Sequence, residues 1–495
     1  MGRRGGEVRR AEEVRASDAG CRADEPQDIL HAEPAHHVNE LMDISETPPA
    51  SRGHRLAALL RRHWWVLAAC ALAVALRAPF VAIMHSQPTS DSLVYVTAAR
   101  SLAEGHGYSY NGHPTAFFPI GWPALIAALY LVSRSYSFAM ILWAGVGLWA
   151  ATTALIYVSG LKLGGRTTAI IAAFIVAAYP DFIFPSLRAF SENLFIPLLV
   201  GACILLVPRA GERLGARRAA LAGLVLGLAI LVRSTAALLP MVLGLWLLLQ
   251  YRDRRAVMVA AAFVAVAYLV LVPWLVRNEV VMKTLAISTN GGYTLWLGDN
   301  PHATGGNAVT KEHPRWDLHT TAREVRDNQR RTQRALEFIT HHTGQWLGLI
   351  PAKAYYLFDW NAGALERSTD AANTDPQARV RERVLTPAEH TLIVTARRFY
   401  PALRVVNWLW WLGGFAAVAW AIRRRRPGAT LVAIVVALWI VLHVTLIHGQ
   451  FRYMLSVQPL MAAPMAWALV TLCAGAWVRA RPGGANAGTR GDVAD

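Results

Sequence analysis

Long apolar runs separated by short basic segments are the dominant pattern of this chain. Runs of this kind cover residues 64–84, 139–161, 168–184, 193–207, 219–250, 256–276, 403–422, 430–447 and 454–478. A helix of about 20 apolar residues crosses the hydrocarbon part of a bilayer, and a soluble domain does not carry so many such runs. The pattern therefore predicts an all-α polytopic membrane protein with about ten to twelve transmembrane helices.

Two apolar stretches do not have the length of a single span. The run 219–250 is too long for one ordinary helix and is basic at both ends, so we expect a hairpin that turns near Arg233. Residues 117–132 are short for a span and contain Pro119, Gly121 and Pro123. We therefore expect residues 117–132 to form a surface or re-entrant helix.

The positions of lysine and arginine give each span a direction. Short loops rich in arginine, such as residues 423–426, favour the cytoplasmic side of the membrane. With residues 117–132 kept at the surface, the basic loops fall on that side and both termini are cytoplasmic. The segment 277–398 then lies outside, and its part 346–358, rich in Trp and Tyr, is expected to be an interfacial helix.

This path through the membrane predicts five parts of the chain. They are a disordered cytoplasmic tail (residues 1–55), an N-terminal transmembrane module (56–276) with interfacial helices in its first outer loop (85–137), a mixed extracytoplasmic segment with an interfacial helix (277–400), C-terminal transmembrane helices (401–480) and a second disordered cytoplasmic tail (481–495).

Charge and cysteine content argue against a nucleic-acid-binding protein and against a protein held together by disulfides or a cysteine-based metal cluster. The net charge is +17, but the arginines gather in loops between spans, so membrane topology explains the excess and no nucleic-acid partner is expected. Cys70, Cys203 and Cys473 lie inside apolar runs. We therefore expect neither a structural disulfide nor a cysteine-based metal cluster.

The first outer loop carries an acid close to the membrane. Asp91 opens a short helix that Ser90 is expected to cap and that Gly105 or Gly107 ends. Asp91 is therefore either a stabiliser of the positive end of the helix or a general base at the membrane surface. Tyr95, one turn later, either orients this carboxylate or anchors the helix at the interface.

Further charged residues fall on the same outer side. Glu192 opens a span, and its carboxylate either pairs with Arg188 or helps to hold a substrate group. Three arginines at this side either extend their guanidinium groups to the membrane surface or bind phosphate: Arg233, Arg277 and Arg452. Lys353, in the expected interfacial helix, is a candidate for contact with lipid headgroups.

The outer segment contains one loop with strong turn signals. Residues 291–306 read GGYTLWLGDNPHATGG, in which Asn300-Pro301 and paired glycines demand turns. This loop either covers a site or is a plain solvent turn. The scattered histidines show no zinc-ligand spacing, and no phosphate-binding loop or dinucleotide fingerprint occurs in a suitable context.

Taken in order, several short motifs resemble a known family. They are Asp91 with Tyr95, Ala99, Leu102 and Gly105; PIGWP at residues 119–123; Pro180 followed by Ser191-Glu192; Arg233; GDNPHATGG at 298–306; and FRYMLSVQP at 451–459. Together they cover most of residues 56–479. In this order the chain resembles bacterial glycosyltransferases of the GT-C superfamily, in particular the protein O-mannosyltransferase and aminoarabinose-transferase-like group (family 39-like).

The resemblance implies a substrate class and site residues. It implies a polyprenyl-phosphate-linked sugar as donor and a lipid, glycan or protein acceptor, with Asp91 and Glu192 as catalytic acids. Substrate binding would fall to Tyr95, Arg233, Arg277, Lys353 and Arg452. Many relatives carry an acidic pair at the first site, whereas Ser92 follows Asp91 here. The resemblance therefore leaves two alternatives, a site that binds a divalent cation and a site that binds none.

The expected function is that of a glycosyltransferase of the bacterial inner (cytoplasmic) membrane. It would move a sugar from the lipid carrier to an acceptor hydroxyl or phosphate group at the extracytoplasmic face, with the transmembrane module 56–276 as its catalytic part. The alternative is a polytopic lipid or solute transporter or flippase, which places ionisable groups near the membrane midplane. A third alternative is a membrane scaffold whose outer segment binds a partner.

Overall fold

The computed structural model of the chain describes residues 52–83, 87–88, 90–183, 188–208, 211–307, 320–359 and 398–480. The predicted tails therefore lie outside the described residues, except that helix α1 (Arg52–Ile83) begins within the first of them. Contacts divide the chain into two units, Met1–Arg61 and Arg62–Asp495. The second unit holds everything that follows.

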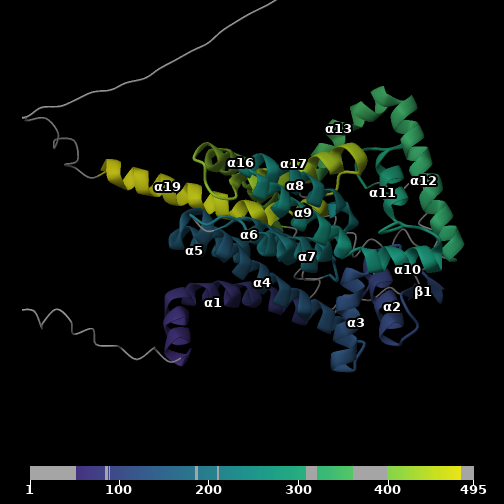
Figure 1. The fold of residues 1–495 in the computed structure, drawn as a ribbon, viewed down its shortest axis with the longest axis horizontal. Coiled ribbons are helices and arrows are strands. Elements are labelled where there is room, and N and C mark those ends of the chain that lie inside the picture. The colour runs from purple at the N-terminus through teal and green to yellow at the C-terminus, as the bar shows by residue number, and fades with distance from the viewer. Residues whose placement is uncertain are drawn as a thin grey trace, which may run out of the picture. The chain divides into compact units, whose positions relative to one another are not determined.

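The described residues of every apolar run that the sequence predicts to cross the membrane are mainly helical in this unit (Figure 1). Seven stretches among the described residues are long and apolar enough to span: His63–Ile83, Phe138–Gly164, Ser234–Tyr251, Arg254–Met282, Pro401–Arg423, Ala429–Leu446 and Gln458–Ala476. Three further helices in predicted spans are shorter: α5 (Arg166–Ala178), α6 (Glu192–Leu206) and α7 (Ala216–Val232). The predicted all-α polytopic membrane fold is confirmed.

The predicted hairpin in the long apolar run is confirmed as well. Helix α7 ends at Val232, and the short 3₁₀-helix η3 (Ser234–Leu238) leads into α8 (Leu239–Tyr251). Arg233 between them has extended backbone dihedrals (φ −141°, ψ 108°), which breaks the helical hydrogen-bond pattern. The turn therefore presents the Arg233 side chain at one end of two helices.

The first outer loop contains two helices and a small hairpin. Helix α2 (Asp91–Ala103) is followed by strands β1 (Ser109–Tyr110) and β2 (His113–Pro114), which pair antiparallel, and by helix α3 (Gly121–Ser133). The expected cap by Ser90 is wrong. Ser90 has φ +50° and makes no side-chain capping bond, because its hydroxyl turns toward the Asp91 carboxylate at 3.5 Å.

The described part of the outer segment is mostly helical. After α10 (Val272–Met282), which ends the spanning stretch Arg254–Met282, come α11 (Gly291–Gly298), α12 (Thr321–His341) and α13 (Thr343–Phe358). Helix α13 contains the stretch 346–358 that the sequence predicts to be helical. Its place at a membrane surface stays a prediction.

The chain returns through the last apolar helices. These are α16 (Tyr400–Arg423), α17 (Ala429–Leu446) and α19 (Ala462–Ala480), with the short helices α18 (Phe451–Met454) and η5 (Gln458–Met461) between the last two. The polar segment 447–457 thus interrupts two apolar helices. This interruption brings Arg452 back to the level at which α6 begins and α7 ends.

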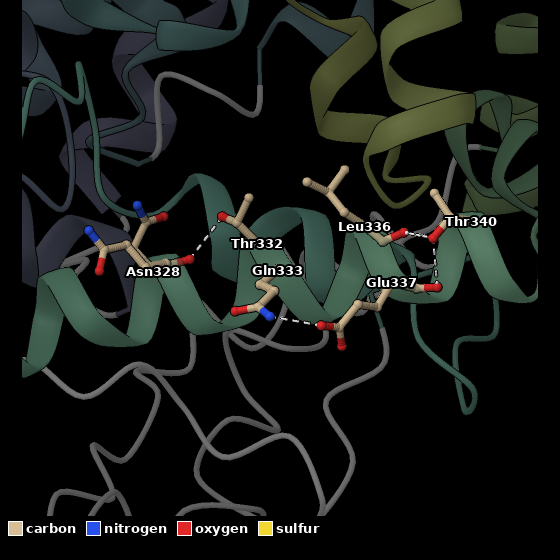
Figure 2. Close-up of a pocket in the computed structure, with 7 residues that line it drawn as sticks. Asn328, Thr332, Gln333, Leu336, Glu337 and Thr340 are labelled. Carbon is tan, nitrogen blue, oxygen red and sulfur yellow. Dashed lines mark hydrogen bonds between the residues drawn. The ribbon is translucent and has the colours of Figure 1, made fainter.

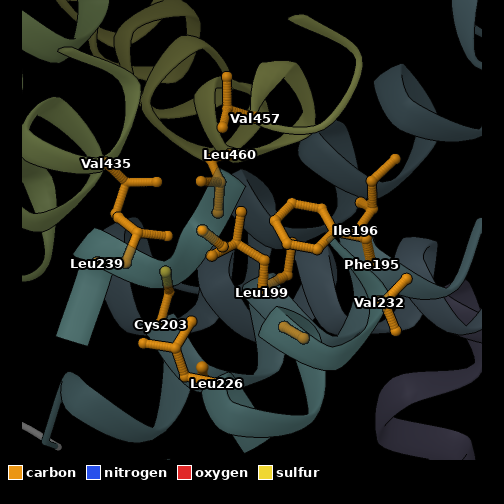
Figure 3. Close-up of a cluster of buried hydrophobic side chains, with 14 of the residues drawn as sticks. Phe195, Ile196, Leu199, Cys203, Leu226, Val232, Leu239, Val435, Val457 and Leu460 are labelled. Atoms are coloured by element: carbon orange, nitrogen blue, oxygen red, sulfur yellow. The ribbon is translucent and has the colours of Figure 1, made fainter. Parts of the chain in front are cut away.

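The core forms around α6 and α7. Buried side chains of these helices meet others from α8, α17 and the segment after α18 (Figure 3): Phe195, Ile196, Leu199, Cys203, Leu226, Val232, Leu239, Val435, Val457 and Leu460. Helix α7 also packs closely on α9 (Arg254–Leu269). A Cβ atom on Gly227 would lie 2.6 Å from the Ala267 carbonyl oxygen, so this glycine permits the close helix packing that is common in membranes.

The PIGWP motif places a second glycine at a close contact beside the hairpin turn. A Cβ atom on Gly121 would lie 2.7 Å from the Leu231 carbonyl oxygen and 2.8 Å from Val232 Cγ2. Both neighbours belong to the last turn of α7, directly before Arg233. Gly121 therefore allows α3 to rest on the end of α7.

We expect Gly121→Ala to lower the stability of the folded protein by about 1–3 kcal/mol, because the added methyl group meets backbone atoms that cannot move aside. Gly147→Ala is the matched control, since Gly147 lies within α4 (Phe138–Gly164) with no atom within 4 Å of its added Cβ. Thermal unfolding of both variants in detergent micelles measures the difference. Equal melting temperatures for the two variants would contradict the close contact.

Candidate active site

Four charged side chains from distant parts of the sequence meet at helix ends. Asp91 and Glu192 are the first residues of α2 and α6, and Arg233 follows the last residue of α7. Arg452 comes from the short helix α18. Carboxylates at helix N-termini and a guanidinium at a helix C-terminus are the charges that the helix dipoles favour, so the backbone supports this arrangement.

Arg452 joins the two carboxylates. Its Nη1 donates to Asp91 Oδ2 at 2.7 Å, while its Nε and Nη2 donate to the two oxygens of Glu192 at 2.6 and 3.0 Å. Arg233 adds a second cation, with its Nη1 2.8 Å from Glu192 Oε1. The result is a continuous chain of charges, Asp91–Arg452–Glu192–Arg233, which we call the ionic chain.

The members of the ionic chain differ in exposure. The side chain of Asp91 is 23% exposed and that of Arg452 is 16% exposed. Those of Arg233 and Glu192 are 10% and 0% exposed. Asp91 is thus the most exposed member of the ionic chain, and Glu192 is the buried acid that binds both guanidinium groups.

Aromatic rings hold the two guanidinium groups in place. The Arg452 guanidinium carbon lies 3.8 Å from the centre of the Phe190 ring, and that of Arg233 lies 5.7 Å from the Tyr453 ring. Burial disfavours the charged form of Arg452, but the carboxylates of Glu192 and Asp91 outweigh this effect and raise the pKa of Arg452 well above its usual value. Arg452 is therefore a permanent cation beside Asp91.

Tyr95 lies next to the ionic chain. Its hydroxyl donates to Ser191 Oγ at 3.5 Å, and its ring contacts Phe118 at a centroid distance of 4.5 Å. Burial, followed by the negative charge of Asp91, raises the pKa of Tyr95. Its hydroxyl thus remains protonated, and its ring packs on Phe118, the residue directly before the PIGWP motif.

Arg277 is placed elsewhere. Its guanidinium donates to the carbonyl oxygens of Thr115 and Tyr108 at 2.8 and 2.7 Å, and to Asn278 Oδ1 at 2.9 Å. These contacts attach the first outer loop to α10. The structure therefore does not bring Arg277 to the ionic chain, and its geometry favours support of the loop over the predicted phosphate contact.

Lys353 is also separate from the ionic chain and is fully buried. Its Nζ lies 2.6 Å from Asp299 Oδ1 and donates to the Thr445 carbonyl oxygen at 3.3 Å. Burial lowers the pKa of Lys353 and raises that of Asp299 to about 6, against their mutual attraction. This position gives Lys353 a protein partner where the sequence predicts contact with lipid headgroups.

The glycine-rich loop packs on the segment that leads to Arg452. The Gly449 amide donates to the Gly305 carbonyl oxygen at 2.7 Å, and Gly306 and Gly449 form a parallel bridge. A Cβ atom on Gly298 would lie 2.7 Å from the His448 nitrogen. The loop is therefore ordered, and its close contacts fix residues 447–449, three to five residues before Arg452.

Sequence reasoning missed Phe190, Tyr453 and His448. Phe190 stacks on Arg452, and the Tyr453 hydroxyl lies 3.0 Å from His448 Nε2. The sequence signal that could have found two of them is their position beside charged candidates, since Phe190 stands two residues before Glu192 and Tyr453 follows Arg452. Aromatic rings beside charged residues are as typical of a membrane interface as of a site, so this signal alone does not separate the two.

The donor set does not fit a divalent cation. Both oxygens of Glu192 and one oxygen of Asp91 already accept bonds from guanidinium groups. Among the residues that the structure describes, no group of three or more His, Cys, Asp or Glu side chains is placed to hold a metal ion. A cation at this site would have to displace Arg452, so we derive no step through a metal.

Similarity to known proteins appears at the level of the fold. No protein-family model matches the chain, and no curated protein matches it in sequence. The apo structure of ArnT from Cupriavidus metallidurans matches with a TM-score of 0.50 and 14% identity, over 86% of this chain and 62% of that one. This likeness shows that the chain shares the membrane fold of that structure, so the resemblance read from the sequence motifs is confirmed as far as the fold.

Two further structures match more distantly. The oligosaccharyltransferase of Archaeoglobus fulgidus in complex with Zn and sulfate has a TM-score of 0.47 at 14% identity, over 84% of this chain and 50% of that one. ArnT from Cupriavidus metallidurans bound to undecaprenyl phosphate has a TM-score of 0.35 at 13% identity, over 84% of this chain and 79% of that one. The chain thus spans about half the length of the oligosaccharyltransferase.

We expect Lys353→Met to destabilise the protein by about 3–5 kcal/mol, because it leaves the buried Asp299 carboxylate without its cation. The double variant Lys353→Met/Asp299→Asn removes both charges and should recover most of this loss. Arg100→Met, which breaks an exposed pair with Glu104, is the control and should leave the melting temperature nearly unchanged. Thermal unfolding measures all three, and a double variant as unstable as the single one would contradict the pairing.

Proposed function

We propose that the protein is a glycosyltransferase of the bacterial inner membrane. It moves a sugar from a polyprenyl-phosphate carrier to an acceptor hydroxyl or phosphate group at the extracytoplasmic face. The observation that carries this proposal is the ionic chain within a GT-C fold, with a partly exposed carboxylate, Asp91, beside two largely buried guanidinium groups. This arrangement supports the assignment of Asp91 as a base and of the guanidinium groups as the binding site for an anionic leaving group.

For an acceptor hydroxyl, the reaction is a single displacement with inversion at the sugar. The acceptor oxygen forms a bond to the anomeric carbon while the bond from that carbon to the phosphate oxygen breaks. The electron pair leaves with the lipid phosphate, and the acceptor proton passes to Asp91. Among the described residues, Asp91 Oδ1 contacts only the Ser90 hydroxyl, at 3.5 Å, so this oxygen is available to the acceptor.

Arg233 and Arg452 stabilise the departing phosphate. A guanidinium fork matches phosphate oxygens in shape and charge, and charge placed in advance near a leaving group lowers the barrier. Within the described residues, Nε of Arg233 is buried and has no hydrogen-bond partner. An unsatisfied buried donor is costly, which supports the assignment of Arg233 to a substrate anion.

Glu192 acts through the arginines. It is fully buried and holds both guanidinium groups, so it positions the cations and does not reach the acceptor. Tyr95 likewise positions Phe118, directly before the PIGWP motif, against the helix of Asp91. The transporter alternative is less favoured, because the four charges of the ionic chain lie at helix ends and transport sites lie near the midplane.

We expect Asp91→Asn to lower sugar transfer by about 10²- to 10⁴-fold, because it keeps the shape of the side chain and removes the base. Glu104→Gln, an exposed acid directly after the same helix, is the matched control. Membranes are incubated with a panel of radiolabelled undecaprenyl-phosphate sugars, and the label on the acceptor fraction is counted. Asp91→Asn membranes that transfer sugar at the wild-type rate would refute the role of Asp91 as base.

The donor set at the ionic chain also predicts the effect of metal removal. We expect sugar transfer to continue at an unchanged rate in excess EDTA, because guanidinium groups occupy the carboxylate oxygens that a cation would need. Added Mg²⁺ or Mn²⁺ should not raise the rate. Loss of transfer in EDTA with recovery on addition of a divalent cation would show that the described geometry changes on metal binding.

A further inference from the structure

Helix α12 carries a row of exposed arginines. Arg323, Arg326, Arg330 and Arg334 are all exposed, and their spacing of three, four and four residues places them on one face of the helix. Eleven residues of helix extend about 16 Å. We call these four side chains the arginine row.

Acidic neighbours leave this row positive. Asp327 pairs with the buried Arg331 at 2.8 Å, and Glu324 is buried against the first outer loop. Glu337 accepts from Gln333. Arg326, Arg330 and Arg334 therefore add three guanidinium groups to a face on which Glu337 is the one exposed acid of the described helix, a charge excess that fits an anionic partner.

A groove runs along the neighbouring face of the same helix. Its volume is about 510 Å³, and it is lined by the amide and hydroxyl side chains of Asn328, Gln329, Thr332, Gln333 and Thr340, by the aliphatic Leu336 and by the carboxylate of Glu337 (Figure 2). Amides and hydroxyls both donate and accept hydrogen bonds, as sugar hydroxyls require. The row and the groove thus offer anion binding and saccharide binding side by side.

The start of α12 is attached to the wall of the active site. Glu324 accepts bonds from the Thr115 hydroxyl at 2.7 Å and from the Ala116 amide at 3.0 Å. Residues 115–118 lead to Phe118, whose ring packs on Tyr95. A chain that lies along α12 is therefore guided toward the loop beside Asp91.

A lipid surface is a poorer partner for this face. The apolar side of α12 is already buried in the protein through Val325, Ala335 and Phe338. A helix that lies on a bilayer needs its apolar face for the lipid. The exposed side of α12 offers Leu336 as its one large hydrophobic residue within the described helix.

We propose that the outer face of α12 binds an acidic glycan, a saccharide chain that bears carboxylate, sulfate or phosphate groups, and that this glycan is the acceptor. The arginine row binds the anionic groups in fork geometry, and the groove binds the sugar rings. The claim that this glycan is the acceptor rests on the proposed function. The claim that α12 binds the glycan does not depend on catalysis.

The test is binding of a fluorescent heparin oligosaccharide to the full-length protein in neutral detergent micelles. We expect Arg326→Gln/Arg330→Gln/Arg334→Gln to bind at least roughly tenfold more weakly, with a shallower dependence on salt because fewer counterions are released. The corresponding triple change to lysine keeps the charge and should retain most of the affinity. Arg217→Gln/Arg254→Gln/Arg255→Gln removes as many exposed arginines from other loops and should bind like wild type.

Two further variants separate the parts of the proposal. Gln329→Ala/Gln333→Ala should weaken heparin binding severalfold, because the groove loses two amides. Asp91→Asn should bind heparin like wild type although its sugar transfer is lost, so failure of the binding surface and failure of the proposed function are read separately. Uncharged dextran should not bind.

Three results would overturn the proposal. They are equal affinity of the arginine-row and control triple variants for heparin, unchanged affinity of the groove variant, and binding to phosphatidylglycerol vesicles that depends on the arginine row while heparin binding does not. The last result would assign α12 to the membrane surface.

Discussion

The interaction on which this structure depends is the bond of one arginine to two carboxylates. Glu192 is fully buried at the start of an apolar helix, and an unpaired charge there would cost several kcal/mol. Arg452 and Arg233 remove this cost, and the cation that satisfies Glu192 also reaches Asp91. The need to neutralise one buried acid therefore builds the proposed catalytic centre.

The surrounding polar contacts fix the segments that carry these charges. Arg277 holds the first outer loop by its carbonyl oxygens, and Glu324 holds the same loop from α12. Lys353 and Asp299 form a second buried pair beside the glycine-rich loop, which packs on residues 447–449. Residues predicted to touch substrate thus support the loops next to the site, and such support is what accurate placement of a base requires.

Helix α12 connects the first outer loop to an exposed surface of the protein. Helix α12 begins at a contact with the first outer loop and continues as an exposed, basic and hydrogen-bonding surface. A site at the membrane with a recognition surface leading to it is suited to a long acceptor.

The sequence by itself determined the membrane fold, because the bilayer demands long apolar helices, and the arginine pattern predicts the direction of each span. It also predicted the hairpin turn at Arg233 and the helix that begins at Asp91. Only the tertiary structure decided which charged residues meet. Arg277 and Arg452 look alike in sequence, each beside an apolar helix at the outer side, yet one binds backbone carbonyls and the other binds Asp91 and Glu192. These partners lie more than a hundred positions away from each arginine in the sequence. Local sequence patterns do not show which of these distant residues come together in space.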